Sequence, residues 1–185
     1  MRHRYIVLIG VFLLNSHLLN AQGIAVKSNV LYDATATFNL GMEVALSKQV
    51  SLELSGNHNP WNFSQYRKIK HWMIQPEIRY WSRALFSGHF FGFHGLISQF
   101  NVGNIAFLGL EGVRYQGFLY GCGVSYGYLW RVTSWLGLEF SLGAGYAYID
   151  YETIAARPCG PSLGRGSKHY VGPTKAGLTL VFLLK

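Results

Sequence analysis

Seven charged side chains lie inside stretches where apolar residues alternate with small or polar ones. Their residue types are the ones that could take part in acid–base catalysis or form salt bridges. They are Lys27, Glu43, Glu53, Glu77, Arg79, Glu139 and Lys175. Paired carboxylates can do acid–base work, whereas carboxylates beside cations form salt bridges. All seven share the parity of the neighbouring Gly, Ser, Thr and Asn residues, so on strands they would lie on one face. We therefore interpret them as a structural salt-bridge network, and we predict no catalytic residues.

The alternation is clearest between Leu136 and Tyr148, where large apolar residues interleave with Gly, Ala, Ser and Glu139. A soluble strand averages about 5–6 residues, whereas a tilted strand that crosses a bilayer needs about 9–11. Eight such segments can be assigned: 25–32, 39–46, 50–57, 71–81, 89–100, 117–128, 136–148 and 174–184. The pattern predicts an all-β fold, an eight-stranded antiparallel up-and-down transmembrane β-barrel.

The connections between these segments alternate in length. The short ones are Ser47–Gln49, Ser82–Gly88 and Arg131–Ser134; the long ones are Asn57–Lys70, Asn101–Tyr115 and Tyr151–His169. Short periplasmic turns and longer extracellular loops are typical of outer-membrane barrels. Aromatic residues beside the short turns predict an interfacial girdle made of Tyr80, Trp81, Trp130 and Trp135.

The amino terminus has the pattern of an export signal. Arg2, His3 and Arg4 precede an apolar stretch that is too short for a membrane-spanning helix, and Ala21 suits a cleavage site. We predict a signal peptide over 1–21, a barrel domain over 22–185 and a location in the bacterial outer membrane.

Beyond the leader the chain remains basic, since removing Arg2 and Arg4 leaves 14 basic residues against eight acidic ones. An exported protein rarely meets nucleic acid, so we expect the basic loops to face anionic outer-membrane lipid or glycolipid. The candidate loop surface consists of Trp61, Phe63, Arg67, Lys68, Lys70, Arg157, Arg165 and Lys168.

The interior of an eight-stranded barrel is just wide enough for side chains to fill it. Buried charges need partners, so the sequence predicts a closed polar core in place of an open pore. No H-x-x-H or H-E-x-x-H spacing is present, so we predict neither a metal site nor a cofactor. Cys122 and Cys159 are expected to be free thiols.

Several sequence words resemble those of an uncharacterised family of Bacteroides-type outer-membrane proteins, domain-of-unknown-function family 3575. The words are Lys27-Ser28-Asn29-Val30-Leu31-Tyr32-Asp33-Ala34, Leu54-Ser55-Gly56-Asn57-His58-Asn59-Pro60-Trp61, Gln75-Pro76-Glu77-Ile78-Arg79-Tyr80-Trp81, Tyr115-Gln116-Gly117 and Gly172-Pro173-Thr174-Lys175-Ala176. The resemblance implies a small exported barrel, OmpA-like in form and encoded near fimbria-assembly genes. It implies no established activity.

The last segment also resembles the assembly signal that outer-membrane barrels present to the barrel insertion machinery, through Lys175, Gly177, Leu180 and Phe182. We expect a monomeric, non-enzymatic barrel that contacts other surface components or supports a fimbrial or adhesin subunit through its loops. The alternatives are a lipid-modifying or proteolytic enzyme of the outer membrane and a narrow channel.

Overall fold

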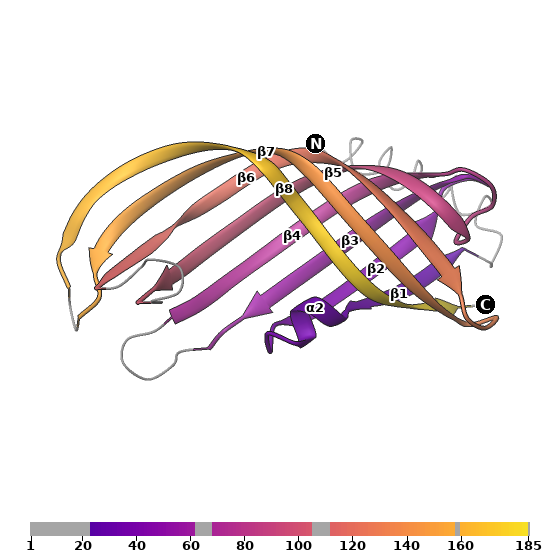
Figure 1. Ribbon diagram of the computed structural model, residues 1–185, viewed down its shortest axis with the longest axis horizontal. Coiled ribbons are helices and arrows are strands. Elements are labelled where there is room, and N and C mark those ends of the chain that lie inside the picture. Colours follow the sequence, from indigo (N-terminus) through magenta and orange to yellow (C-terminus); the bar gives the residue numbers. More distant parts are fainter. Residues whose placement is uncertain (1–22, 62–67, 105–111, 158–159, 185) are drawn as a thin grey trace, which may run out of the picture.

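A computed structural model describes residues 23–61, 68–104, 112–157 and 160–184. Within these ranges, eight antiparallel strands each pair with the next, and β8 returns to β1 to close the ring (Figure 1). The elements are β1 (Ile24–Asn29), α2 (Val30–Asp33), β2 (Phe38–Ala45), β3 (Val50–Asn59), β4 (Lys68–Trp81), β5 (Gly88–Gly103), β6 (Val113–Arg131), β7 (Leu136–Ala155) and β8 (Ser162–Leu184). The predicted all-β fold of eight antiparallel strands is confirmed. No helix within the described ranges has the length and apolar character needed to cross a membrane.

Inward and outward faces alternate along each strand, as the side-chain period of two requires. On β7, Glu139 and Ser141 are buried while Phe140 and Leu142 are exposed. The interior of the ring is therefore polar over much of its length, and large apolar side chains on every strand from β2 to β8 face outward.

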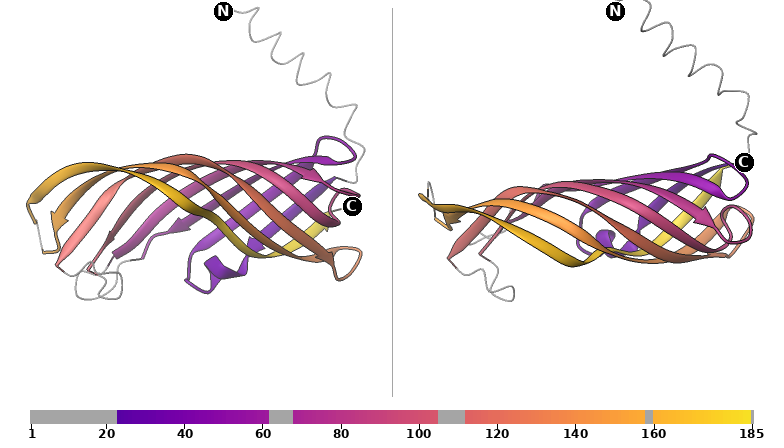
Figure 2. Two further views of the ribbon diagram at one scale, coloured as in Figure 1. Left: turned by 45° about the horizontal axis from the view of Figure 1, so that its top comes forward. Right: turned by 90° about the horizontal axis from the view of Figure 1, so that it is seen from above.

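The strands grow longer along the chain, from six residues in β1 to 23 in β8. The strands β5 to β8 consequently reach well beyond β1 to β3 (Figures 1 and 2). Strand β1 pairs only with residues 179–184 of β8, so in the described structure residues 162–178 of β8 have no partner strand on that side. The predicted long loops are wrong in extent, because cross-strand pairing continues through Lys68–Lys70, Asn101–Gly103 and Tyr151–Ala155.

The first strand ends earlier than predicted, because the chain turns into α2 at Val30. Two asparagine side chains replace backbone pairing at this point. Asn29 donates from Nδ2 to the Ala176 carbonyl at 3.2 Å and accepts from the Leu178 N–H at 3.3 Å. On the other side, Asn39 Oδ1 accepts from the Asn29 N–H at 2.6 Å. The seam between β1 and its neighbours thus keeps its hydrogen bonds after β1 ends.

An apolar cluster lies inside the ring toward the end with the short turns. It consists of Ala25, Trp81, Phe86, Phe90, Leu129 and Val181. The turn between β4 and β5 contributes Phe86, held at φ 55°, whose ring meets Trp81 edge-on at 5.9 Å. Trp81 is fully buried and donates from Nε1 to Ser51 Oγ at 2.8 Å. Its placement in an outer aromatic girdle is therefore wrong, since Trp81 has the inward parity of Glu77 and Arg79.

Truncating a side chain of this apolar cluster, the plug around Trp81, should lower the stability of the whole folded ring. Trp81→Ala removes a fully buried indole and should lower the free energy of unfolding by about 3–5 kcal/mol. Trp130→Ala, at a site that is 60% exposed, is the matched control and should have a much smaller effect. Denaturant unfolding of the purified protein checks this, and equal losses for the two variants would contradict a structural role for the apolar cluster.

Candidate functional site

The seven charged residues singled out in the sequence come together inside the ring, next to the apolar cluster. They arrive from six strands: Lys27 from β1, Glu43 from β2, Glu53 from β3, Glu77 and Arg79 from β4, Glu139 from β7 and Lys175 from β8. All of their side chains are at least nine-tenths buried. The network therefore joins strands at both ends of the sequence.

Arg79 is the centre of the network. Its Nη1 lies 3.0 Å from Glu43 Oε2 and 3.0 Å from Glu139 Oε2, and its Nη2 lies 2.6 Å from Glu53 Oε2. Glu77 Oε2 is 3.4 Å from the same Nη2. The second oxygen of Glu139 accepts from Nη2 at 3.1 Å, so that pair is bidentate, the strongest geometry for an arginine–carboxylate contact. The guanidinium carbon also sits 4.2 Å from the centre of the Phe90 ring.

Two lysines supply the remaining positive charge. Lys27 Nζ contacts Glu43, Glu53 at 2.8 Å and Glu139 at 2.6 Å. Lys175 Nζ contacts Glu77 and lies 3.5 Å from Glu53. Every carboxylate thus meets at least two cations, which is what buried charges require to remain charged.

The strand register explains why so many cations are needed. Glu43 stands directly opposite Glu53 on the neighbouring strand, and Glu53 stands opposite Glu77. Like charges in cross-strand pairs repel, so this row of three would be destabilising alone. Two serine hydroxyls assist the cations: Ser51 donates to Glu43 and Ser125 donates to Glu77.

Glycine provides the space that the network occupies. A Cβ at Gly92 would lie 1.9 Å from Glu77 Oε1, and one at Gly127 would lie 2.3 Å from the Phe90 ring. The inward glycines predicted from the alternation therefore make room for the large charged and aromatic side chains on facing strands.

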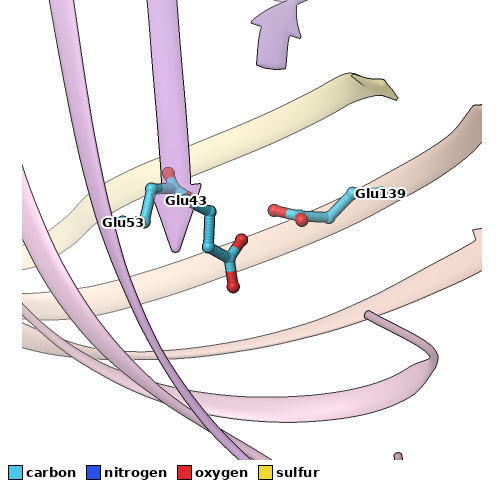
Figure 3. Close-up of side chains that lie close together, drawn as sticks. All are labelled: Glu43, Glu53 and Glu139. Atoms are coloured by element: carbon cyan, nitrogen blue, oxygen red, sulfur yellow. The ribbon is translucent and has the colours of Figure 1, made fainter. Parts of the chain in front are cut away.

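Three of the carboxylates approach one another closely enough to suggest a metal site. Glu43, Glu53 and Glu139 each offer an oxygen within 4.8 Å of the others, and their side chains converge in Figure 3. The Lys27 ammonium contacts all three, so it supplies the positive charge that an ion would bring. In this arrangement the positive charge of Lys27 neutralises the negative charges of the three carboxylates.

The remaining predicted site residues are those of the assembly signal and of the loop surface. They lie apart from this network, except that Lys175 belongs to both the assembly signal and the network. In the assembly signal, Lys175 and Gly177 have the inward parity, and Phe182 is outward and stacks on Trp135 at 6.2 Å. In the loop surface, Lys68, Lys70, Arg165 and Lys168 lie on strands, which corrects their assignment to loops. Trp61 packs on Phe38 and Arg157 is exposed.

Some of the predictions concern residues outside the described ranges. These are the signal peptide at 1–21, the loop residues Phe63 and Arg67, and Cys159. Cys122 is a free and exposed thiol on the outward face of β6.

Sequence reasoning missed Phe90, which supports the network with its ring against the Arg79 guanidinium. Ser51, Ser125 and His94 lie inside the ring, as their parity predicts, and His94 is bonded through Nε2 to Thr174 Oγ1 at 2.9 Å. The partners of these residues could not be predicted, because they follow from the register between strands.

Comparison with known proteins assigns a family. The family model described as a protein of unknown function (DUF3575) matches residues 6–184, so the chain belongs to that family. No curated protein and no solved structure matches the chain.

Removing the central cation should be far more harmful than removing an exposed one. Arg79→Met leaves four buried carboxylates with two lysines, and breaking a buried ion pair in this way costs about 3–5 kcal/mol of folding free energy. Arg83→Met, an exposed residue in the β4–β5 turn, is the control and should change stability by less than about 0.5 kcal/mol. Denaturant titration of the purified proteins measures both, and wild-type stability of the Arg79 variant would contradict the importance of the network.

Proposed function

We propose that this member of the DUF3575 family is a monomeric, non-enzymatic β-barrel of the bacterial outer membrane. Its polar core is filled, and it acts in surface interaction or in support of fimbria or adhesin assembly. The distribution of exposed apolar side chains is the observation that supports the membrane location. Leu40, Leu54, Phe93, Val124 and Leu142 are each more than half exposed, and they belong to five different strands.

An apolar belt of this kind favours a hydrocarbon surrounding. In water it would expose far more contiguous apolar surface than a soluble monomer usually carries. Aromatic side chains lie toward its two ends on the outward face: Tyr128 and Trp130 toward one end of β6, Phe118 and Tyr120 toward the other. Such aromatic girdles are typical of transmembrane barrels. The signal segment expected at 1–21 supports the same location.

The filled core favours a structural or interaction role over a channel. The seven-charge network and the plug around Trp81 occupy the interior over adjacent layers. An enzyme of the outer membrane is the other alternative, and it would need a reactive cluster; the described carboxylates of the core are instead held by cations. Conductance across planar bilayers is therefore expected to stay at background.

The outer part of β8 supports the proposed contact with a fimbrial or adhesin subunit. Residues 162–175 form a strand edge that β1 does not cover, and this edge carries the exposed Arg165 and Lys168. Unpaired strand edges accept extended segments of other chains. Insertion itself would use the barrel insertion machinery, through the Lys175, Gly177, Leu180 and Phe182 signal.

The membrane proposal predicts a depth-dependent effect of added charge. Val124→Arg places a guanidinium in the middle of the belt and should cost about 2–4 kcal/mol in a bilayer. Val132→Arg, similarly exposed but in the β6–β7 turn, should be tolerated. Folding into liposomes, followed by the mobility shift of unheated samples on detergent gels, distinguishes them. Equal folding of both variants, with soluble behaviour of the wild type, would contradict a membrane barrel.

The interaction proposal predicts a partner at the free edge of β8. A photoreactive amino acid replacing the exposed Ser167 should crosslink to a fimbrial or adhesin subunit in intact cells. The same replacement at Val124 is the control and should give no protein crosslink, because that position faces lipid. Identical crosslinks from both positions, or none from Ser167, would argue against the edge as a contact surface.

A further inference from the structure

The outward face of β4 to β6 changes character row by row toward the end with the long strands. Cross-strand register defines four successive rows: Ile74, Ile97 and Tyr120; Trp72, Gln99 and Phe118; Lys70, Asn101 and Gln116; Lys68, Gly103 and Arg114. The sequence of rows runs from apolar, through tryptophan and amide, to cationic. A lipid molecule has the same order from its acyl chains to its headgroup.

A groove of about 280 Å³ lies at the transition between these rows. His58, Lys70, Trp72, Gln99, Asn101 and Gln116 line it from the outward face, and Asn59, His71 and Phe100, which have the inward parity, line it as well. The side chains along it are held in place by hydrogen bonds, with Trp72 Nε1 donating to Gln99 Oε1 at 2.9 Å and Asn101 Nδ2 donating to Gln116 Oε1 at 3.1 Å. The groove is therefore built from ordered polar groups that border the apolar belt.

Three cations stand at or just beyond this groove: Lys70 lines it, and Lys68 and Arg114 occupy the next row. Within the described residues, no carboxylate lies within ion-pair distance of Lys68, Lys70 or Arg114. The pKa of Lys68 lies below its usual range because of partial burial and because of the charges of Arg114 and Lys70. The Nε of Arg114 is buried and has no hydrogen-bond acceptor in the described structure. These groups repel one another and leave donors available, so an anion would stabilise them.

Among the described residues, these four rows carry no acidic side chain on β4, β5 or β6. In the outermost row Gly103 stands between Lys68 and Arg114, and the Cα and Cβ of Arg114 pack directly against it. The nearest acidic residues in these rows are Asp150 and Glu152 on β7, beyond Phe118 and Gln116. Glu152 stands opposite Gln116 and lies 3.9 Å from Arg165, a cation on β8. The cations of these rows are therefore Lys68 and Lys70 on β4 and Arg114 on β6, one strand away from the nearest carboxylates.

We propose that this groove binds the phosphate headgroup of an anionic lipid, with the acyl chains lying along the Ile74, Ile97 and Tyr120 row. Lys68, Lys70 and Arg114 contact the phosphate, and Trp72 lies at the boundary between headgroup and chains. The proposal rests on the membrane location proposed above, and it adds a defined site and a ligand class. It favours a lipid over free phosphate because the groove continues directly into the apolar belt.

Native mass spectrometry tests the proposal with protein in micelles doped with phosphatidylglycerol or, at the same mole fraction, phosphatidylcholine. Each basic residue near a membrane surface contributes about fivefold to anionic-lipid binding. The K68Q/K70Q/R114Q variant should therefore lose the preference for phosphatidylglycerol by at least about fivefold. The K48Q/R83Q/R131Q variant removes the same charge at the opposite end and should keep the preference.

The proposed lipid site would be overturned by a preference that survives in K68Q/K70Q/R114Q or by an equal loss in the control variant. Displacement of bound lipid by excess inorganic phosphate would also overturn it, because that result would indicate a free-phosphate site. Insertion into liposomes is scored separately for every protein. A wild type that inserts without any lipid preference overturns the groove and leaves the membrane proposal standing, whereas failure to insert overturns the membrane proposal itself.

Discussion

Four carboxylates and three cations share one buried layer inside the ring, and the need to keep them paired constrains the rest of the structure. Arg79 contacts all four glutamates, and Lys27 bridges β1 to β2, β3 and β7. A buried charge that loses its partner is strongly destabilising, so the strands that carry these groups must stay in register. The network thus ties the first strand of the ring to the last ones.

Much of this could be predicted from parity alone. Charges such as Glu139 stand among glycine and serine on one face of a long alternating run, and this places them in a common interior. Parity does not give the register between strands. The row of Glu43, Glu53 and Glu77, and the matching of Gly92 to the Glu77 carboxylate, depend on turn geometry and strand offset, which composition does not reveal.

Two predictions fail for identifiable physical reasons. The turn beside Trp81 indicates an interfacial position, whereas the parity that Trp81 shares with Arg79 places it inside. The predicted loop segments carry Gly, Ser, Arg and Lys in weak alternation, yet neighbouring strands continue to pair with them. A bulge in β8 opposite Gly143 and Ala144 shifts the register between β7 and β8. The inward and outward positions of β8 that precede Lys175 could therefore not be assigned by counting residues back from the C-terminal end of that strand.

The claim that the outward face contacts lipid around a sealed polar core can be tested at Cys122, an exposed thiol on that face. A nitroxide attached to Cys122 in a Cys159→Ser variant, folded into liposomes, reports whether its surroundings are hydrocarbon or water. Power-saturation spectroscopy should show high accessibility to molecular oxygen and low accessibility to a water-soluble nickel chelate. High accessibility to the nickel chelate would contradict a membrane-spanning barrel.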